Sequence, residues 1–278
     1  MAQTLDASPR RCGIVGHPVA HSVSPAMYRA AFARCGLPWT YEAIDVPEGG
    51  LAGFVGGLDA TWRGLSVTMP HKQDVLRLGT PDETSRLVGA ANTLVLEDDG
   101  TRSVRNTDVA GVVGALRGRR VESVGTAVIA GAGATARSVL AGLARLGLRD
   151  VLVQLRDVGK AGPMVELART LGVAIRLGPI GEHAGCDVVV STLPARVADA
   201  WAEALAEGAG AVFDAVYDPW PTALNRAAHA AGAVVVDGLD LVSAQAVDQI
   251  AALCGCEVAA ADLRAAALAE LSGRGKQG

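Results

Sequence analysis

Features that would define several other classes of protein are missing from this chain of 278 residues. It has no excess of positive charge, since the formal net charge is −4 and the isoelectric point is near 5.7, which argues against nucleic-acid binding. No uncharged apolar run reaches the roughly 18 residues of a membrane span, and the first residues lack the apolar core of a signal peptide. We therefore expect a soluble, cytoplasmic protein with no nucleic-acid or membrane partner.

Cysteine is scarce and scattered. The five cysteines are Cys12, Cys35, Cys186, Cys254 and Cys256, an odd number. Only the last two are close in sequence, and one C-x-C without a second pair is a poor metal site. We expect reduced thiols and no bound metal.

Apolar residues make up half of the chain, which is ample for sizeable cores, and the length fits one large domain or two ordinary ones. In the first hundred residues, short strands are predicted at 12–16, 41–46, 64–68 and 91–96. Ser24-Pro25 has the pattern of an N-cap followed by the first helical residue, and 98–100 is a hairpin turn signal. Strands that alternate with helical stretches predict an α/β layer with largely parallel pairing.

The second half alternates more regularly. Helices are predicted at 108–116, 164–171 and 198–206, with a helical tail over 244–271. The predicted strands are 126–130, 151–155, 173–176, 188–191, 211–215 and 233–236. This order fits a six-stranded doubly wound, Rossmann-type sheet. We expect an α/β protein of two domains, residues 1–108 with 238–278 and residues 109–237, with the active site in the cleft between them.

A G-x-G-x-x-A fingerprint directly follows the strand predicted at 126–130. Gly131 permits a tight turn, Gly133 lets the backbone approach a pyrophosphate, and Ala136 allows close helix–strand packing. Ala132 and Ala134 complete the turn. The alternative is an alanine-rich turn that binds nothing, but the strand–turn–helix context favours a dinucleotide. More than a hundred residues precede this site, and we expect them to hold the substrate.

Cofactor preference is read at the end of the next strand, where Leu155, Arg156 and Asp157 stand. Arg156 offers a planar fork for a 2′-phosphate, whereas a carboxylate at Asp157 would repel that group. We expect NADP, with NAD as the alternative.

The first hundred residues also hold several polar clusters. Ser22 and Ser24 precede a helix, where hydroxyl donors and the helix dipole suit a carboxylate. Lys72 follows a strand and a proline, and Asn92 and Asp108 lie at element ends. From the residues alone, each of these is also an ordinary cap, turn or surface charge.

With these motifs in order, the chain resembles the shikimate dehydrogenase family over nearly its whole length. Residues 16–25 resemble the family's H-S-x-S-P segment, 64–72 its G-x-N-V-T-x-P-x-K motif, 89–93 its G-A-x-N-T motif and 106–108 its N-T-D motif. The resemblance implies that Ser22 and Ser24 hold the substrate carboxylate. It makes Lys72 the catalytic lysine, paired with Asp108, and implies further substrate contacts from Ser66, Thr68, Asn92, Tyr217 and Gln245.

The chain departs from the family pattern at several of these positions. Ser66 replaces an asparagine, which alters one expected substrate hydrogen bond. Leu241, in the segment that begins at Gly238, replaces a methionine that packs against the nicotinamide, and Ala134 replaces a frequent glycine. Residues 155–157 stand where many members have Asn-Arg-Thr.

The implied reaction is the reversible, NADP-dependent reduction of 3-dehydroshikimate to shikimate in aromatic amino-acid biosynthesis, by a monomer or homodimer. Serines at both 22 and 24 fit shikimate better than quinate. The alternatives are a quinate or amino-shikimate dehydrogenase that uses NAD, a non-catalytic NADP-binding sensor of the same fold, and a cyclohydrolase-like folate enzyme. His21 and His71 flank the site, and we expect both to be structural.

Overall fold

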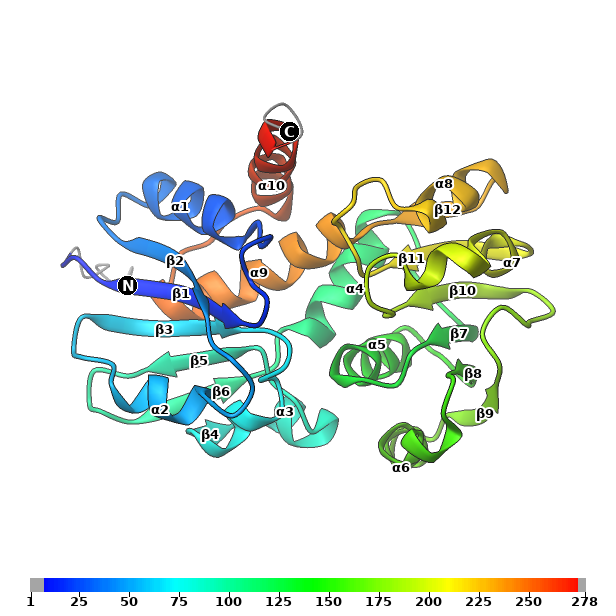
Figure 1. Ribbon diagram of the computed structural model, residues 1–278, viewed down its shortest axis with the longest axis horizontal. Helices are drawn as coiled ribbons and strands as arrows, with labels where there is room; N and C mark the ends of the chain where they lie inside the picture. Colours follow the sequence, from blue (N-terminus) through cyan, green and yellow to red (C-terminus); the bar gives the residue numbers. More distant parts are fainter. Residues whose placement is uncertain (1–7, 275–278) are drawn as a thin grey trace. The chain divides into compact units, whose positions relative to one another are not determined.

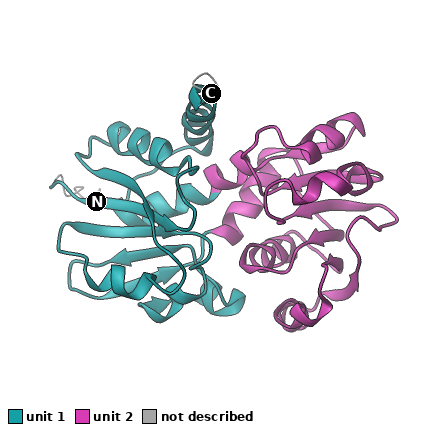
Figure 2. Cartoon of the chain, in the orientation of Figure 1, with its two compact units in different colours: residues 1–107, 245–278 teal, residues 108–244 magenta. Residues whose placement is uncertain are grey.

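The chain forms two compact units, coloured separately in Figure 2, in the computed structural model, which describes residues 8–274. Unit 1 comprises Met1–Thr107 and Gln245–Gly278, and unit 2 comprises Asp108–Ala244. The second boundary falls inside helix α9 (Gly238–Cys254), not before it as the expected domain limits had it. No proline or glycine interrupts this helix after its first residue, so the sequence carries no mark of a boundary there.

Unit 1 is built on a mixed six-stranded sheet (Figure 1). Its strands are β1 (Arg11–Gly16), β2 (Thr40–Asp45), β3 (Trp62–Val67), β4 (Thr80–Pro81), β5 (Thr93–Leu96) and β6 (Arg102–Arg105). They lie in the order β2-β1-β3-β5-β6-β4. The expected strands are confirmed to within two residues, but largely parallel pairing is only partly right. Strands β5 and β6 form the hairpin expected at 98–100, and β5 also pairs antiparallel with β3. A short turn can join only antiparallel neighbours, so the hairpin signal already required this exception.

The helix expected at Ser24-Pro25 is α1 (Ser24–Arg34), but Ser24 is not its N-cap. The N-cap is Val23, and Ser24 is already the first helical residue. The capping contact comes from one residue further back, where the Ser22 Oγ accepts the Ser24 backbone N–H at 3.2 Å. The expected helix start is therefore correct, but the hydroxyl that accepts a backbone N–H at this helix end belongs to Ser22 and not to Ser24.

The predicted helical tail is two helices, α9 and α10 (Ala260–Arg274). They are separated at Gly255, which has a left-handed φ of +69° that suits glycine and ends α9. Helix α10 packs along α1. The short helices α2 (Leu51–Gly56) and α3 (Glu83–Val88) were not anticipated, because six residues offer little periodicity.

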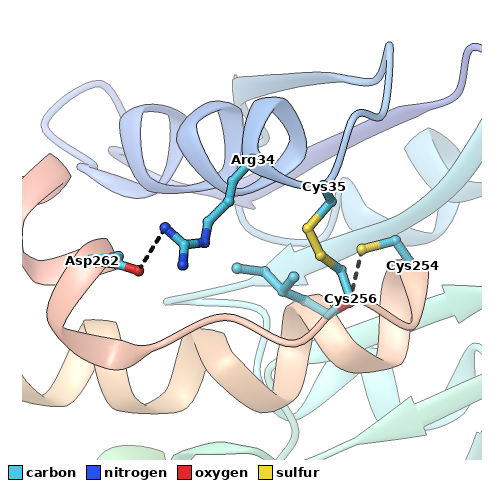
Figure 3. Close-up of a disulfide and its surroundings, with 6 residues drawn as sticks. Arg34, Cys35, Cys254, Cys256 and Asp262 are labelled. Atoms are coloured by element: carbon cyan, nitrogen blue, oxygen red, sulfur yellow. Dashed lines mark hydrogen bonds and ion pairs between the residues drawn. A yellow bond between two sulfur atoms is a disulfide. The ribbon is translucent and has the colours of Figure 1, made fainter.

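A disulfide joins Cys35, the residue that caps α1, to Cys256 in the loop between α9 and α10 (Figure 3). The expectation that all five thiols are reduced is therefore wrong. The two cysteines are 221 residues apart and their Cα atoms 6.5 Å apart, so only the fold makes them neighbours. Cys12, Cys186 and Cys254 are free.

Unit 2 confirms the doubly wound sheet. Its strands are β7 (Thr126–Ala130), β8 (Asp150–Gln154), β9 (Ala174–Gly178), β10 (Cys186–Ser191), β11 (Ala209–Asp214) and β12 (Val234–Val236). All pair in parallel, in the order β12-β11-β10-β7-β8-β9. Counted from β9, this is the order 3-2-1-4-5-6 of dinucleotide-binding sheets.

Helices cover both faces of this sheet, as parallel strands require. They are α4 (Asp108–Gly118), α5 (Ala134–Arg145) and α6 (Gly162–Leu171) on one face, and α7 (Ala202–Ala206) and α8 (Ala223–Ala230) on the other. Alternate residues of β7 reach opposite cores: Ile129 packs with Leu140 of α5, and Val128 with Leu205 of α7. No helix in the described residues is long and apolar enough to cross a membrane.

Candidate functional site

The two predicted carboxylate-binding serines lie where the segment between β1 and α1 runs into the helix. Ser22 is in this segment, which has neither helix nor strand, and Ser24 is the first residue of α1. Both are buried, at 5% and 3% exposure. Gly16 ends β1 where a Cβ would collide with the Thr68 side chain, so the ends of β1 and β3 approach closely only because this residue is glycine. The segment therefore begins beside the loop that follows β3.

That loop carries Thr68 and Lys72. The Thr68 N–H donates to the Val15 carbonyl at 2.9 Å, and the Lys72 carbonyl accepts from the Ala91 N–H at 2.7 Å. The backbone on either side of the lysine is therefore tied to β1 and to the segment before β5. The Lys72 side chain itself is half-buried.

His71, next to the lysine, is fully buried, and its Nε2 lies 2.7 Å from the Val46 carbonyl oxygen. This environment agrees with the structural role expected of it. His21 is exposed.

Ser66, where the family motif has asparagine, lies in a buried hydroxyl cluster. The Tyr41 hydroxyl donates to Ser66 Oγ at 2.6 Å, and this Oγ lies 3.1 Å from the Oε1 of Gln249 and 3.2 Å from the Tyr28 hydroxyl. Tyr28 also donates to Gln249 Oε1. Burial raises the pKa of both tyrosines, so both remain neutral donors. The shorter serine side chain is thus engaged by other protein groups.

Asn92 and Gln245, two predicted substrate contacts 153 residues apart, are brought into direct contact. The Asn92 amide donates to Gln245 Oε1 at 2.6 Å and to Thr107 Oγ1 at 2.9 Å. Its Oδ1 accepts from the Thr107 backbone N–H at 2.9 Å and from the Thr93 hydroxyl at 3.1 Å. The amide of Asn92 is therefore held in one orientation by groups from three separate segments.

Gln249 was missed by the sequence reading. It lies one turn after Gln245 on α9, is 1% exposed, and donates from Nε2 to the Asn92 carbonyl at 2.7 Å and to Thr93 Oγ1 at 2.8 Å. It joins the Ser66 cluster to the Asn92 cluster. A second glutamine four residues after the first, on the same face of the helix, is the signal that could have indicated it.

In unit 2, the glycine turn has the local geometry expected of it. Gly131 has φ +114°, and a Cβ there would collide with the Thr192 hydroxyl, so both its conformation and its surroundings require glycine. A Cβ on Gly133, by contrast, would meet nothing within 4 Å. Gly133 is the N-cap of α5, and no side chain of the described residues caps that helix end. Space and an uncapped helix N-terminus beside Gly133 suit a phosphate.

The remaining fingerprint positions behave as structural parts of the same turn. Ala136 is fully buried in the core against the sheet, as close helix–strand packing requires. Ala132 and Ala134 are half-buried. Arg137 follows at 5% exposure, and burial lowers the pKa of its guanidinium.

The two charged residues of the loop after β8, Arg156 and Asp157, have different surroundings. Arg156 is exposed, and Leu155 before it is buried. The Asp157 carboxylate accepts the Gly159 backbone N–H at 3.0 Å and caps the short 3₁₀ turn Val158–Lys160. The acid that argued against NADP therefore has a local backbone partner.

The end of unit 2 contributes the other predicted positions. A Cβ on Gly238 would collide with the Val216 backbone, so α9 begins in close contact with the chain after β11. Leu241 is 8% exposed within the core of unit 2, and Tyr217 is half-buried. Asp108, the first residue of α4, is 5% exposed.

The predicted site residues thus fall into two sets. Ser22, Ser24, Ser66, Thr68, Lys72, Asn92 and Gln245 lie in unit 1, whereas Asp108, Tyr217 and every predicted cofactor residue lie in unit 2.

The chain is similar to known proteins in both sequence and structure. A family model described as "Shikimate dehydrogenase substrate binding domain" matches residues 14–94. The shikimate dehydrogenase (NADP(+)) of Rubrobacter xylanophilus is 38% identical over 283 residues, which cover 98% of each chain. Among solved structures, the Mycobacterium tuberculosis shikimate dehydrogenase is 39% identical with a TM-score of 0.86, covering 94% of this chain and 100% of that one. A Thermus thermophilus shikimate 5-dehydrogenase in complex with NADP(H) and shikimate is 30% identical with a TM-score of 0.83, covering 94% and 99%.

Proposed function

The chain belongs to the shikimate dehydrogenase family, and we propose that it catalyses the reversible, NADP-dependent reduction of 3-dehydroshikimate to shikimate. Similarity over nearly the full length of relatives that bear this name supports the proposal. The observation that carries it is the direct hydrogen bond between Asn92 and Gln245, which joins two expected ring-binding amides from distant segments. In this proposal, unit 1 binds the substrate and unit 2 the dinucleotide.

The substrate is a small carboxylated ring. Ser22 and Ser24 hold its carboxylate, because both hydroxyls lie at the N-terminus of α1, where an anion is favoured. Asn92 and Gln245 hold ring hydroxyls, and the other bonds of the Asn92 amide give it a fixed orientation in advance. Thr68, Ser66 and Tyr217 complete the proposed set; Ser66 acts through its bonds to the tyrosines and Gln249, since these already engage its hydroxyl.

Lys72 performs the proton transfer. As the ketone becomes an alcohol, its oxygen gains negative charge, and the Lys72 ammonium stabilises that charge and donates a proton to the oxygen. In the reverse direction the neutral amine accepts the proton. Asp108 is proposed to orient the Lys72 ammonium, as the family motif implies.

The glycine turn of unit 2 fits a dinucleotide. The space beside Gly133 and the uncapped start of α5 hold the pyrophosphate, with Gly131, Ala132, Ala134 and Ala136 forming the turn. NADPH, when bound, supplies the hydride. Gly238 and Leu241 are proposed to contact the nicotinamide end.

One set of assays tests the activity. Purified protein is mixed with shikimate, quinate or amino-shikimate and either NADP or NAD, and the absorbance of the reduced cofactor is followed. We expect shikimate with NADP to give the largest kcat/KM. Preference for quinate, for amino-shikimate or for NAD would overturn the substrate or cofactor assignment. Cofactor binding without any turnover would indicate a sensor of the same fold.

The cofactor assignment has its own test in Arg156→Ala. Loss of a charged partner for the 2′-phosphate is expected to raise the KM for NADP about 10- to 100-fold and to leave the KM for NAD unchanged. Arg169→Ala, which removes an exposed arginine of the same unit, is the matched control. An equal effect of Arg156→Ala on both cofactors would contradict the assignment. A monomeric or homodimeric state and a cytoplasmic location stay predictions.

A further inference from the structure

The last described residue of α10 reaches back to the segment that holds the serines. Arg274 donates from Nη1 to the His21 carbonyl at 2.7 Å and from Nη2 to the Ser22 carbonyl at 3.0 Å. Its Nε donates to Glu270 Oε1, one helical turn earlier, at 3.1 Å. The planar guanidinium thus joins two consecutive peptide carbonyls, which an ammonium could not match with the same geometry.

The opposite end of α10 is also attached to α1. Near the start of α10, Asp262 pairs with Arg34 at 3.3 Å, and the disulfide at Cys35 lies beside this pair, as Figure 3 shows. Helices α1 and α10 therefore run antiparallel, with the disulfide and the ion pair at one end and Arg274 at the other. The position of Arg274 relative to the β1–α1 segment follows from this pairing.

The segment that Arg274 contacts has no regular structure of its own. Residues 17–23 form turns and bends, yet Ser22 within them is buried. The Ser22 Oγ accepts the Ser24 N–H, which leaves the hydroxyl hydrogen to be donated to an anion. Because Arg274 holds the carbonyls of residues 21 and 22, it restrains the two peptide planes that direct this hydroxyl.

We propose that Arg274 is a positioning residue for the substrate carboxylate: it holds the Ser22 segment in its binding conformation before the substrate arrives. The inference rests on the proposed function, since the carboxylate is the group that Ser22 and Ser24 are proposed to bind. A preformed donor set lowers the ordering cost of binding, so the residue acts on substrate affinity and not on the proton transfer at Lys72.

The test is Arg274→Gln, compared with Arg274→Lys and with Arg34→Gln. The last removes an arginine from the same helix pair at the end remote from the serines, and so controls for simple loosening of α10. Each protein is assayed with shikimate and with its methyl ester, which lacks the charged carboxylate, and its melting temperature is recorded.

For Arg274→Gln we expect the KM for shikimate to rise roughly 3- to 10-fold, with kcat and the KM for NADP within about twofold of wild type. The methyl ester, which offers the serines no charged carboxylate, should be affected less, so the ratio of ester KM to acid KM should shrink. Arg274→Lys, which keeps one donor, should recover part of the loss, and Arg34→Gln should change neither KM.

Three outcomes would overturn the inference. An active wild type whose KM for shikimate is unchanged by Arg274→Gln would refute it and leave the proposed function intact. Equal changes for acid and ester, together with a lowered melting temperature, would show that Arg274 only packs α10. A wild type that oxidises none of the carboxylated rings would refute the proposed function, and the role of Arg274 with it.

Discussion

Units 1 and 2 build their predicted sites by different means. In unit 1 the candidate residues are side chains that bond to one another across long stretches of chain, as Asn92 does with Gln245. In unit 2 half of the candidate residues are glycines and alanines of one turn, where backbone conformation and open space matter, as at Gly131 and Gly133. The contrast predicts that substitutions at candidate residues of unit 1 act by removing a functional side chain. Substitutions in the glycine turn of unit 2 should act by changing the backbone conformation or by filling the open space.

The largest effect is expected at Lys72, which tests whether unit 1 carries the chemistry. Lys72→Ala should lower kcat by about 10²- to 10⁴-fold, because the oxygen then loses its proton donor. Arg77→Ala, at an exposed cation a few residues further on, is the control and should keep kcat. Turnover of Lys72→Ala near the wild-type value would refute the catalytic role.

The second largest effect is expected on stability, from the disulfide that joins distant segments of unit 1. Replacing both Cys35 and Cys256 by serine should lower the free energy of unfolding by about 2–4 kcal/mol, since the closed loop is long. Denaturation in urea measures this, with Cys186→Ser in unit 2 as the control. Wild type that is equally stable with and without a reductant would contradict the prediction.

In unit 2, the burial of Asp214 predicts a pH effect between pH 4 and pH 7. Burial raises the pKa of Asp214 from its ordinary value of 3.8 to about 6, although the Val216 N–H, which donates to its Oδ1 at 3.2 Å, acts in the opposite direction. The folded state thus holds more protons than the unfolded state between these values, so stability falls as pH rises through this window and is level above it.

Asp214→Asn removes this titration and tests the assignment. From pH 4 to pH 7, wild type should lose about 2–3 kcal/mol more unfolding free energy than the variant. The comparison is made by urea denaturation at each pH, with the exposed Asp150→Asn as control. Parallel pH profiles of wild type and Asp214→Asn would show that the carboxyl titrates normally.

The smallest expected effect separates the two glycines of the nucleotide turn. Gly131→Ala should cost about 1–2 kcal/mol of stability, because alanine is strained at φ +114° and its methyl group would meet Thr192. Gly133→Ala should leave stability unchanged, since φ there is −77° and the space is open, yet should raise the KM for NADP. Unchanged KM for Gly133→Ala would mean that no phosphate approaches this residue.

The regular half of the chain was the more predictable half. In unit 2 every strand was placed to within two residues, because apolar strands and amphipathic helices alternate locally. Helix α8 was missed, although Thr222 and Asn225 at its start form a capping box that the sequence displays. In unit 1 the two-residue strand β4 and the six-residue helices were missed, because such short elements offer little periodicity, and β6 was indicated only by the turn signal before it.

The site residues show the same division. The motifs named Asn92, Gln245 and Lys72 as candidates by family resemblance, and Gly131 as a candidate by its local turn requirement. Thr107, Gln249 and Arg274 were not identified, because their importance lies in what they contact. Arg274 is more than 250 residues away from the segment it holds, and no local pattern distinguishes it from other helical arginines.

The sequence by itself therefore determined the strands of unit 2, the glycine turn and the family, because all of these depend on neighbouring residues or on ordered motifs. Only the tertiary structure decided that Cys35 bonds Cys256, that Ser66 faces two tyrosines and that Asp157 caps its own loop. The physical reason is that hydrogen bonds and disulfides depend on distance in space. Sequence periodicity indicates which face of a helix or strand is buried, but it does not indicate which residue of another element will contact that face.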